Sequence, residues 1–315
     1  MEWVKNVLRR MPFAVTLWTA YQAVNRVRRG NLLRLYDFPS ISTWLNELTG
    51  SQKNFSLLFE RGETWVVLEN GLQLKYTNKF NSVSAVIVSH GSFEELELNL
   101  VSANLPDSSV FFDIGANVGL YSLSIAHQGR GVEIHAFEPV PDTVLDFKDN
   151  LSRNGLDDRI ILNQLAVADA DGLVYITSDY HSSNYLTDPE STQNKLEVRC
   201  TKVDTYVRDK CIQRIDFLKV DVEGKELSVL KGAEESLKRF RPIVLAEIFE
   251  SPSDFFDRKT EDFREIINFM LNLGYKYYVI DDKNILVHLD RIEEAVFSRS
   301  YHNYLFYYNK VNVNV

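Results

Sequence analysis

The stretch Val110-Phe-Phe-Asp-Ile-Gly-Ala-Asn-Val-Gly119 decides the fold of this chain. An apolar run rich in β-forming residues reaches Asp113, and a turn with two glycines, Gly115 and Gly119, leads into the helical pattern of residues 120–126. A strand, a glycine turn and a helix in this order form the first unit of a nucleotide-binding α/β sheet. Glycine permits the tight turn and lets the main chain approach a ligand closely.

The same segment lacks the features of a site for a phosphate-rich cofactor. The dinucleotide fingerprint G-x-G-x-x-G is absent, and no basic residue lies between Val110 and Ala126. A ligand with a positive sulfonium, an amino group and a ribose tolerates an acidic residue at the mouth of its site. We therefore expect the turn to shape such a cofactor site, with Asn117 suited to a left-handed turn. The residues concerned are Asp113, Gly115, Ala116, Asn117 and Gly119.

A second acidic residue follows at the spacing expected for a ribose anchor. Residues 132–137 have the pattern of the next strand, which ends at Glu138-Pro139, and Glu138 lies 19 residues after Gly119. Doubly wound folds hold ribose hydroxyls with an acidic residue at this point, because a carboxylate accepts hydrogen bonds from two hydroxyl groups. Taken singly, Asp113 and Glu138 could each cap a helix instead. The presence of both at this spacing favours cofactor binding. Pro139 has no N–H group and helps to end the strand.

Alternating strands and helices continue to the end of the chain. This pattern predicts an α/β fold with a seven-stranded, mostly parallel sheet, one antiparallel edge strand and helices on both faces. The expected elements are helices at 93–103, 143–154, 226–240 and 262–273, strands at 159–167, 215–221, 242–247, 275–280 and 303–308, and an antiparallel insertion at 172–177.

The first 90 residues have a different character. Residues 65–76 are two short β runs around Asn70-Gly71, which predicts a hairpin. We expect residues 1–90 to form an N-terminal extension, made of a basic helix and a β-hairpin cap, and residues 91–315 to form the cofactor-binding domain.

The charge of the chain is uneven. Residues 1–34 carry seven basic side chains against Glu2, a net charge of +6, so that −15 remains for the rest of a chain of net charge −9. The apolar run Met11–Ala20 is too short to span a bilayer, and no small-residue cleavage site follows it. Two interpretations stay open, a helix packed on the protein and a basic helix in peripheral contact with the inner face of a membrane. With only Cys200 and Cys211 there is no disulfide framework, and we expect a cytoplasmic protein.

Several motifs together resemble the FkbM family of S-adenosylmethionine-dependent methyltransferases. The resemblance covers roughly residues 93–308 and implies the class I methyltransferase, Rossmann-like fold. It also implies O-methylation, commonly of a hydroxyl on a sugar or another secondary metabolite, and it favours contact between Ala166 and the adenine. The motifs, in the order of the family, are Asp113–Gly119, Ala136–Pro139, Val203–Tyr206, Leu218-Lys-Val-Asp-Val-Glu-Gly224, Leu230–Ala233 and Ala246–Ile248.

The candidates for catalysis lie at the ends of the fourth and fifth strands, where ligands bind in this architecture. Asp221 and Glu247 together offer carboxylate oxygens for Mg²⁺, which would orient and acidify a hydroxyl. Alternatively, Asp221 binds the amino group of the cofactor, and Glu247, Lys225 or His181 serves as the base. A structural interpretation remains for this segment, in which Glu223 stabilises a helix N-terminus and Lys225 is solvated.

Other function classes fit less well. A nicotinamide-dependent enzyme should carry the G-x-G-x-x-G fingerprint, and a nucleic-acid methyltransferase should be basic where this domain is acidic. The acceptor we expect is a hydroxyl-bearing glycan or small molecule, not a nucleic acid. A non-sugar small molecule or lipid and a non-catalytic binding protein are the alternatives, and a homo-oligomer stays open.

Overall fold

The structure, a computed structural model, describes residues 33–34, 55–60, 62–77, 82–177, 186–187, 194–249, 263–280, 286–288 and 301–313. The chain divides into two compact units, Met1–Phe93 and Glu94–Val315. The expected basic N-terminal helix and His181 lie outside the described residues. The domain division expected at residue 90 stays a prediction, as does the role of the N-terminal extension. Within the described parts of the chain, no helix has both the length and the apolar character needed to cross a membrane.

The described residues of the first unit include an antiparallel sheet with the strand order β1-β2-β3-β4 and the helix α4. The predicted hairpin is confirmed, because β3 and β4 pair with Trp65 opposite Lys75. Asn70 Oδ1 accepts a hydrogen bond of 3.0 Å from the Leu72 N–H, which stabilises the turn. The bounds of these elements are β1 Leu33–Arg34, β2 Phe55–Glu60, β3 Glu63–Leu68, β4 Gln73–Lys75 and α4 Val83–His90.

The second unit is built on a sheet of eight described strands in the order β15-β14-β16-β13-β12-β5-β6-β7. Neighbouring strands from β7 to β13 are parallel, which confirms the expected α/β class. The strands are β5 Val110–Ile114, β6 Glu133–Phe137, β7 Ile160–Asn163, β12 Phe217–Val220, β13 Ile243–Phe249, β14 Lys276–Ile280, β15 Leu286–His288 and β16 Tyr301–Tyr307.

The detail of the far edge differs from the expectation of seven strands with one antiparallel edge strand. The antiparallel strand β16 lies inside the sheet, between β13 and β14, and β15 adds another antiparallel strand at the edge. Periodicity identifies a strand but not its neighbours, since pairing across a sheet depends on contacts between distant segments. The buried aromatic side chains of Tyr304 and Phe306 fit this interior position.

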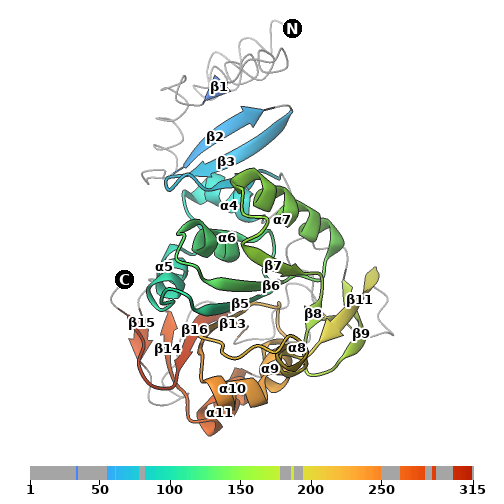
Figure 1. Cartoon of the computed structure of the whole chain (residues 1–315), viewed down its shortest axis with the longest axis vertical. Coiled ribbons are helices and arrows are strands. Elements are labelled where there is room, and N and C mark those ends of the chain that lie inside the picture. Colours follow the sequence, from blue (N-terminus) through green and yellow to red (C-terminus); the bar gives the residue numbers. More distant parts are fainter. Residues whose placement is uncertain are drawn as a thin grey trace, which may run out of the picture. The chain divides into compact units, whose positions relative to one another are not determined.

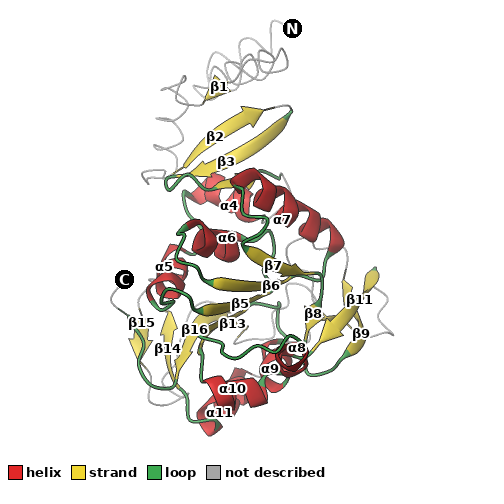
Figure 2. Cartoon of the chain, viewed as in Figure 1, coloured by secondary structure: helices red, strands yellow, loops and turns green. Residues whose placement is uncertain are grey.

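Helices cover both faces of the sheet, as predicted. Figure 1 shows α6 and α7 on one side of the strands and α8 to α11 on the other, and Figure 2 shows the same layers by secondary structure. The helices are α5 Glu95–Ala103, α6 Leu120–His127, α7 Pro141–Asn154, α8 Val203–Asp209, α9 Glu226–Lys231, α10 Glu234–Phe240 and α11 Phe263–Asn272.

Two elements expected to be continuous are broken. The expected strand 159–167 divides into β7 and β8 (Ala166–Val167), and β8 joins a second sheet of order β10-β9-β11-β8 that contains the predicted insertion. That sheet is completed by β9 Gly172–Thr177, β10 Leu186–Thr187 and β11 Lys195–Thr201. The expected helix 226–240 is interrupted at Gly232, where a Cβ atom would lie 2.1 Å from the Ala168 carbonyl oxygen. The second sheet therefore approaches the helix at its break.

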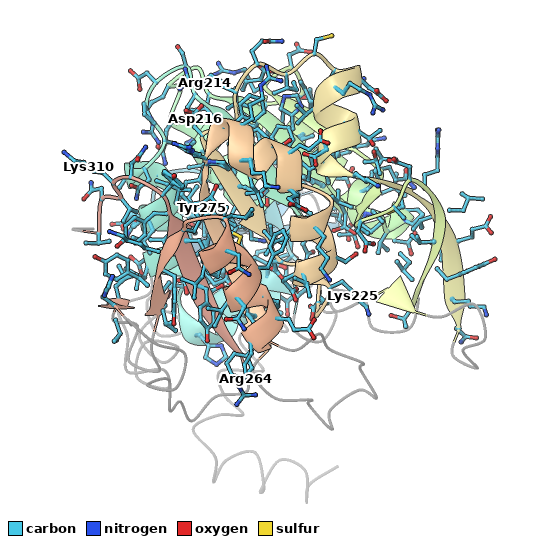
Figure 3. The ribbon with its side chains drawn as sticks, turned by 90° about the horizontal axis from the view of Figure 1, so that it is seen from below. Arg214, Asp216, Lys225, Arg264, Tyr275 and Lys310 are labelled. Carbon is cyan, nitrogen blue, oxygen red and sulfur yellow. The ribbon has the colours of Figure 1, made fainter. Side chains whose placement is uncertain are left out.

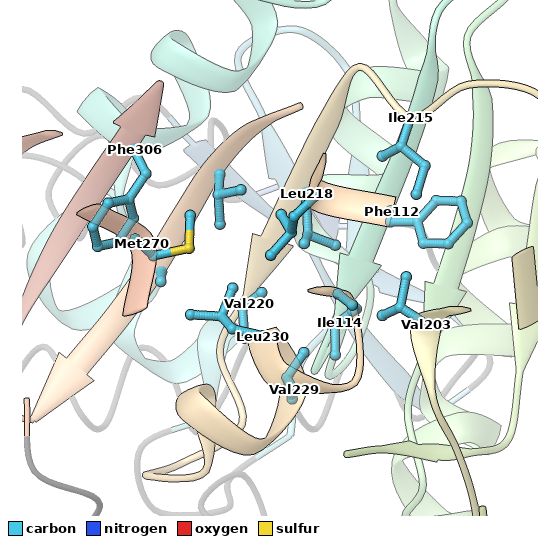
Figure 4. Close-up of a cluster of buried hydrophobic side chains, with 14 of the residues drawn as sticks. Phe112, Ile114, Val203, Ile215, Leu218, Val220, Val229, Leu230, Met270 and Phe306 are labelled. Carbon is cyan, nitrogen blue, oxygen red and sulfur yellow. The ribbon is translucent and has the colours of Figure 1, made fainter. Parts of the chain in front are cut away.

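The main core lies between the sheet and the helices α8 to α11. Figure 4 shows Phe112, Leu218 and Val220 of adjacent strands packed with side chains such as Met270 and Phe306. All of the residues in β5 and β12 are buried, as parallel strands covered on both faces require. This packing fixes the carboxyl ends of the strands relative to one another.

Candidate active site

The strand order reverses between β5 and β12, which makes their carboxyl ends the topological switch point of the sheet. At this point the main chain after β5 almost touches the main chain after β12. A Cβ atom at Gly115 would lie 1.7 Å from the Asp221 carbonyl oxygen, so no larger residue fits without moving one of the two loops. Ligands bind beside such points in open α/β sheets, and the candidate site is therefore built around these two loops.

The glycine turn after β5 is held by the neighbouring strand. The N–H groups of Gly115 and Ala116 both donate to the Phe137 carbonyl oxygen, at 3.0 and 2.9 Å. Gly115, Asn117 and Gly119 have positive φ angles of 76°, 52° and 90°, and a Cβ atom at Gly119 would lie 2.1 Å from the Phe147 ring. The turn therefore requires its glycines, and Asn117 adopts the left-handed conformation that we expected.

Asp113 lies at the base of the turn and is fully buried. Its Oδ2 accepts hydrogen bonds from the Ser122 N–H at 3.1 Å and from the Ser122 hydroxyl at 2.6 Å, which ties β5 to the first turns of α6. Its Oδ1 has no hydrogen-bond partner among the described residues. Burial raises the pKa of this carboxyl, against the lowering effect of Lys219. Asp113 thus supports the turn from below.

Glu138 follows β6 and binds the glycine turn through a hydrogen bond from the main chain of Asn117. Its Oε2 accepts a hydrogen bond of 3.0 Å from the Asn117 N–H, and its Oε1 accepts one of 2.9 Å from the Val140 N–H. Each carboxylate oxygen has a second lone pair, so the group retains acceptor capacity for a hydroxyl. Burial raises the pKa of Glu138 to about 7, although the two N–H donors favour the charged form.

Lys219 lies in the middle of this acidic site, and the sequence reasoning missed it. The side chain is buried in β12, and its Nζ is 3.1 Å from Asp221 Oδ2 and 3.9 Å from Asp113 Oδ1. Burial alone would lower the pKa of Lys219, but Asp221, Asp113 and Glu94 outweigh it and raise the pKa. A lysine inside an apolar strand was the available signal, because buried lysines need a partner.

Asp221 and Glu247 lie on neighbouring strands and face each other. Asp221 follows β12, with 27% of its side chain exposed, and Glu247 is a residue of β13. The pKa of Glu247 is raised well above its usual value by burial and then by the negative charges of Asp221, Glu223 and Glu94, and its carboxyl hydrogen-bonds to Asp221. The structure therefore brings these two candidates together, and burial favours the protonated form of Glu247.

Glu94 and Tyr121 were not among the candidates, yet they complete the acidic group. The Tyr121 hydroxyl donates to Glu94 Oε2 at 2.5 Å, and Glu94 precedes α5 with a positive φ of 47°. Burial raises the pKa of Glu94 to about 7, with Lys219 opposing this and Asp221 adding to it. Glu94 lies more than 100 residues before Asp221 in the chain, and no motif connects the two.

The remaining candidates lie around this centre. Glu223 has a positive φ of 59° in the loop before α9, and Lys225 is the N-cap residue of that helix. Figure 3 shows Lys225 apart from Arg214 and Asp216, which precede β12 at its other end. Ala166 is buried in the small core of the second sheet, against which Val140 packs.

Glu226, the first residue of α9, is buried, whereas the candidate Glu223 in the loop before this helix is only partly buried. Glu226 Oε1 accepts hydrogen bonds from the N–H groups of Val222 and Gly224 at 3.3 and 3.0 Å, and burial raises its pKa to about 8. Among the described residues there is no group of three His, Cys, Asp or Glu side chains that could hold a metal ion. The Mg²⁺ hypothesis for Asp221 and Glu247 therefore gains no third ligand from these residues.

The sequence profile of the Methyltransferase FkbM domain matches residues 113–277, from the turn aspartate to β14 and just over half of the chain. The chain belongs to the FkbM methyltransferase family. The expected family, the class I methyltransferase fold and the S-adenosylmethionine-dependent methyltransferase activity are thereby confirmed. The Gly115 turn, Glu138, Asp221 and Glu247 all lie inside the matched region.

Known relatives match about half of this chain at low identity. Methyltransferase sdnD of Sordaria araneosa is 30% identical over 47% of this chain and 69% of its own length. The 31-O-demethyl-FK506 methyltransferase FkbM of Streptomyces tacrolimicus is 28% identical over 46% of this chain and 67% of its own length. The hexuronic acid methyltransferase AglP of Haloferax volcanii is 24% identical over 48% of this chain and 61% of its own length.

The residues at the switch point fit S-adenosylmethionine. The glycines let the turn pack closely against its neighbours, since a Cβ atom at Gly115 or Gly119 would collide with Asp221 or Phe147. Glu138 offers acceptors to a ribose diol, and the partly exposed carboxyl group of Asp221 complements an amino group. When bound, the cofactor supplies an activated methyl group.

Proposed function

We propose that this methyltransferase acts on a hydroxyl group, most readily on a sugar of a polysaccharide, glycolipid or glycosylated metabolite. The observation that carries the proposal is the carboxyl pair of Asp221 and Glu247, at the carboxyl ends of adjacent strands and beside the glycine turn. A carboxylate at this place is suited to accepting the proton of a weakly acidic hydroxyl.

Positioning accounts for most of the expected rate enhancement. Methyl transfer is an in-line displacement, and alignment of the reacting atoms supplies on the order of 7–11 kcal/mol. A general base adds roughly 10²–10⁴-fold. A sugar hydroxyl is a weak acid, so its oxygen needs a proton acceptor close to the point of transfer. The carboxyl pair meets this need without a histidine.

We assign Asp221 the role of proton acceptor. It is the more exposed member of the pair, and its Oδ2 is held by Lys219. The raised pKa of Glu247 favours its protonated form, so Glu247 is the less suitable proton acceptor of the two. The Asp221 carboxylate would accept the proton of the acceptor hydroxyl, while bound S-adenosylmethionine would supply the methyl group to the oxygen and keep the electron pair of the broken methyl–sulfur bond as S-adenosylhomocysteine. Lys225, His181 and a Mg²⁺ ion bound by the pair remain alternatives that this assignment does not need.

Glu138 and the glycine turn are assigned to cofactor binding. Glu138 is the expected ribose anchor, because its carboxylate ends β6 directly beside Asn117. Gly115, Ala116 and Gly119 form the wall of the methionine part of the site. Contacts of Pro139 and Ala166 with the adenine belong to the same proposal.

The proposal that the acceptor is a sugar is more specific than the proposal that it is a hydroxyl. Support comes from one relative that is named a hexuronic acid methyltransferase, while another relative is named a 31-O-demethyl-FK506 methyltransferase. An acidic site rich in hydrogen-bond acceptors also suits a polyhydroxylated acceptor. A hydroxyl on a lipid or another small molecule is the alternative, and it uses the same carboxyl pair.

The test is to compare methylated glycans from cells that carry the wild-type protein with those from cells that carry Asp221→Asn. We expect one O-methylated sugar in the wild type that is absent with Asp221→Asn. Identical glycan methylation in both, together with a methylated lipid or metabolite present only in the wild type, would replace the sugar by that acceptor. Persistence of the methylated product with Asp221→Asn would refute the role of Asp221.

A further inference from the structure

The ammonium group of Lys219 contacts both loops at the switch point, the turn after β5 and the loop after β12. Its Nζ lies 3.1 Å from Asp221 Oδ2 and 3.4 Å from the carbonyl oxygen of Gly115. The first contact is to the loop after β12 and the second is to the turn after β5. An ammonium group has three donors, so one lysine can bind both loops at once.

Two more side chains lie close to this ammonium group. Asp113 Oδ1 lies 3.9 Å from Nζ, and the Tyr121 ring of α6 lies 4.8 Å from it, within the range of a cation–π contact. The Tyr121 hydroxyl is itself bound to Glu94. Side chains before α5, from β5, from α6 and after β12 therefore surround the head group of Lys219.

We propose that Lys219 is a positioning residue of the cofactor site, which binds the Gly115 carbonyl and the Asp221 carboxylate and so sets the separation of the two loops. Lys219 is buried and acts through these partners rather than on the reacting atoms. The separation matters because the loops already approach each other to the limit that a glycine allows. The inference rests on the proposed place of the cofactor at the glycine turn and does not depend on the acceptor.

The same two strands are also linked at their amino-terminal ends, which provides a matched control. Asp216 Oδ2 accepts a hydrogen bond of 2.8 Å from the Val110 N–H, and Arg214 binds the same carboxylate. Asp216 precedes β12, whereas the cofactor site follows it. Removing Asp216 should weaken the pairing of β5 and β12 without changing the loops at the site.

The test measures the binding of S-adenosylhomocysteine by calorimetry to the wild type, Lys219→Gln and Asp216→Ala, with urea unfolding of each variant in parallel. Glutamine keeps a hydrogen-bond donor but loses the charge and the reach of lysine. We expect the dissociation constant to rise at least about tenfold with Lys219→Gln, a change of about 1.4 kcal/mol. We expect Asp216→Ala to lose stability but to bind as the wild type does.

Lys219→Arg is the second variant, and it decides the matter if Lys219→Gln does not fold. It keeps the charge and thus the ion pair with Asp221, but its broad guanidinium cannot reproduce a compact ammonium between two loops. We expect weaker binding than the wild type here as well, by about threefold or more, following the same distortion of the turn.

Three results would overturn the inference. Wild-type affinity in folded Lys219→Gln or in Lys219→Arg would show that Lys219 only stabilises the fold. Equal weakening in Asp216→Ala would show that general loosening of the sheet, rather than positioning, controls affinity. Failure of the folded wild type to bind S-adenosylhomocysteine would instead contradict the proposed cofactor site itself, so the two failures are distinct.

Discussion

A Cβ atom on Gly115 would lie 1.7 Å from the main-chain oxygen of Asp221. This is far inside van der Waals contact, and the obstacle is backbone that cannot rotate away. Gly115 also has a φ of 76°, which alanine adopts at a cost of roughly 1–2 kcal/mol. The glycine turn after β5 and the loop after β12 are thus in direct contact.

Gly115→Ala should therefore separate the two loops and abolish measurable binding of S-adenosylhomocysteine in calorimetry. The matched control is Gly232→Ala, whose Cβ atom would lie 2.1 Å from the main-chain oxygen of Ala168, at the break between α9 and α10. Both variants should lose roughly 1–3 kcal/mol of stability. Only Gly115→Ala should lose affinity, and normal binding by this variant would contradict the proposed cofactor site.

Glu138→Gln should weaken the binding of S-adenosylhomocysteine by about tenfold or more, or about 1.4 kcal/mol. The carboxylate now accepts from both the Asn117 and the Val140 N–H groups, and an amide must turn its NH₂ group toward one of these donors. Calorimetry gives the dissociation constant. Glu133→Gln, at the opposite end of the same strand, is the control that should bind normally, and equal affinities for all three proteins would remove Glu138 from the site.

Asp221→Asn should slow methyl transfer by roughly 10²–10⁴-fold, the usual contribution of acid–base groups, because an amide cannot accept the proton of the hydroxyl. Glu247→Gln should keep most of the activity, because glutamine resembles the protonated carboxyl group that the raised pKa of Glu247 favours. Steady-state kinetics with any acceptor that the wild type methylates will show the change in kcat. Glu234→Gln on α10, which carries an exposed ion pair with Lys238, is the control. Unchanged kcat in Asp221→Asn would exclude Asp221 as the proton acceptor.

Glu226→Gln should become increasingly stable relative to the wild type as the pH rises from about 4.5 to about 8. The pKa of Glu226 is raised by burial from 4.5 to about 8, so its unfolded form ionises first and the wild type loses stability across this window. Between these two pH values, the difference in the free energy of unfolding should grow by up to about 1.4 kcal/mol per pH unit.

Urea unfolding of both proteins at several pH values between 4.5 and 8.5 measures this difference. Glutamine can still accept hydrogen bonds from the Val222 and Gly224 N–H groups through its carbonyl oxygen, which keeps the comparison clean. A difference in stability that does not depend on pH would mean that Glu226 ionises normally in the folded protein.

The sequence predicted those parts of the site that follow one another in the chain. Residues 110–119 predicted a strand and a left-handed glycine turn, and the structure shows both, with Asn117 at a φ of 52°. Glu138 was expected to end the next strand beside this turn, and it does, at 3.0 Å from the Asn117 N–H. Local geometry and spacing suffice here, because adjacent parallel strands of one β–α–β unit must lie side by side.

Contacts between distant segments were not predictable in the same way. The sequence did not reveal that β16 would enter the sheet beside β13, that residues 159–167 would divide between two sheets, or that Gly232 would break a helix. In each case the partner lies far away in the chain. Periodicity reports which face of an element is buried, and it carries no information on what covers that face.

The sequence alone determined the fold class, the family and the place of Asp113 and Glu138 beside the glycine turn, because these depend on local patterns that keep a fixed order along the chain. The tertiary structure alone decided the electrostatics of the reacting centre. Only folding brings Glu94 and Tyr121 to Lys219, and only burial raises the pKa of Glu247 beside Asp221. Desolvation and close charge pairs arise from packing in three dimensions, which no spacing in the sequence expresses.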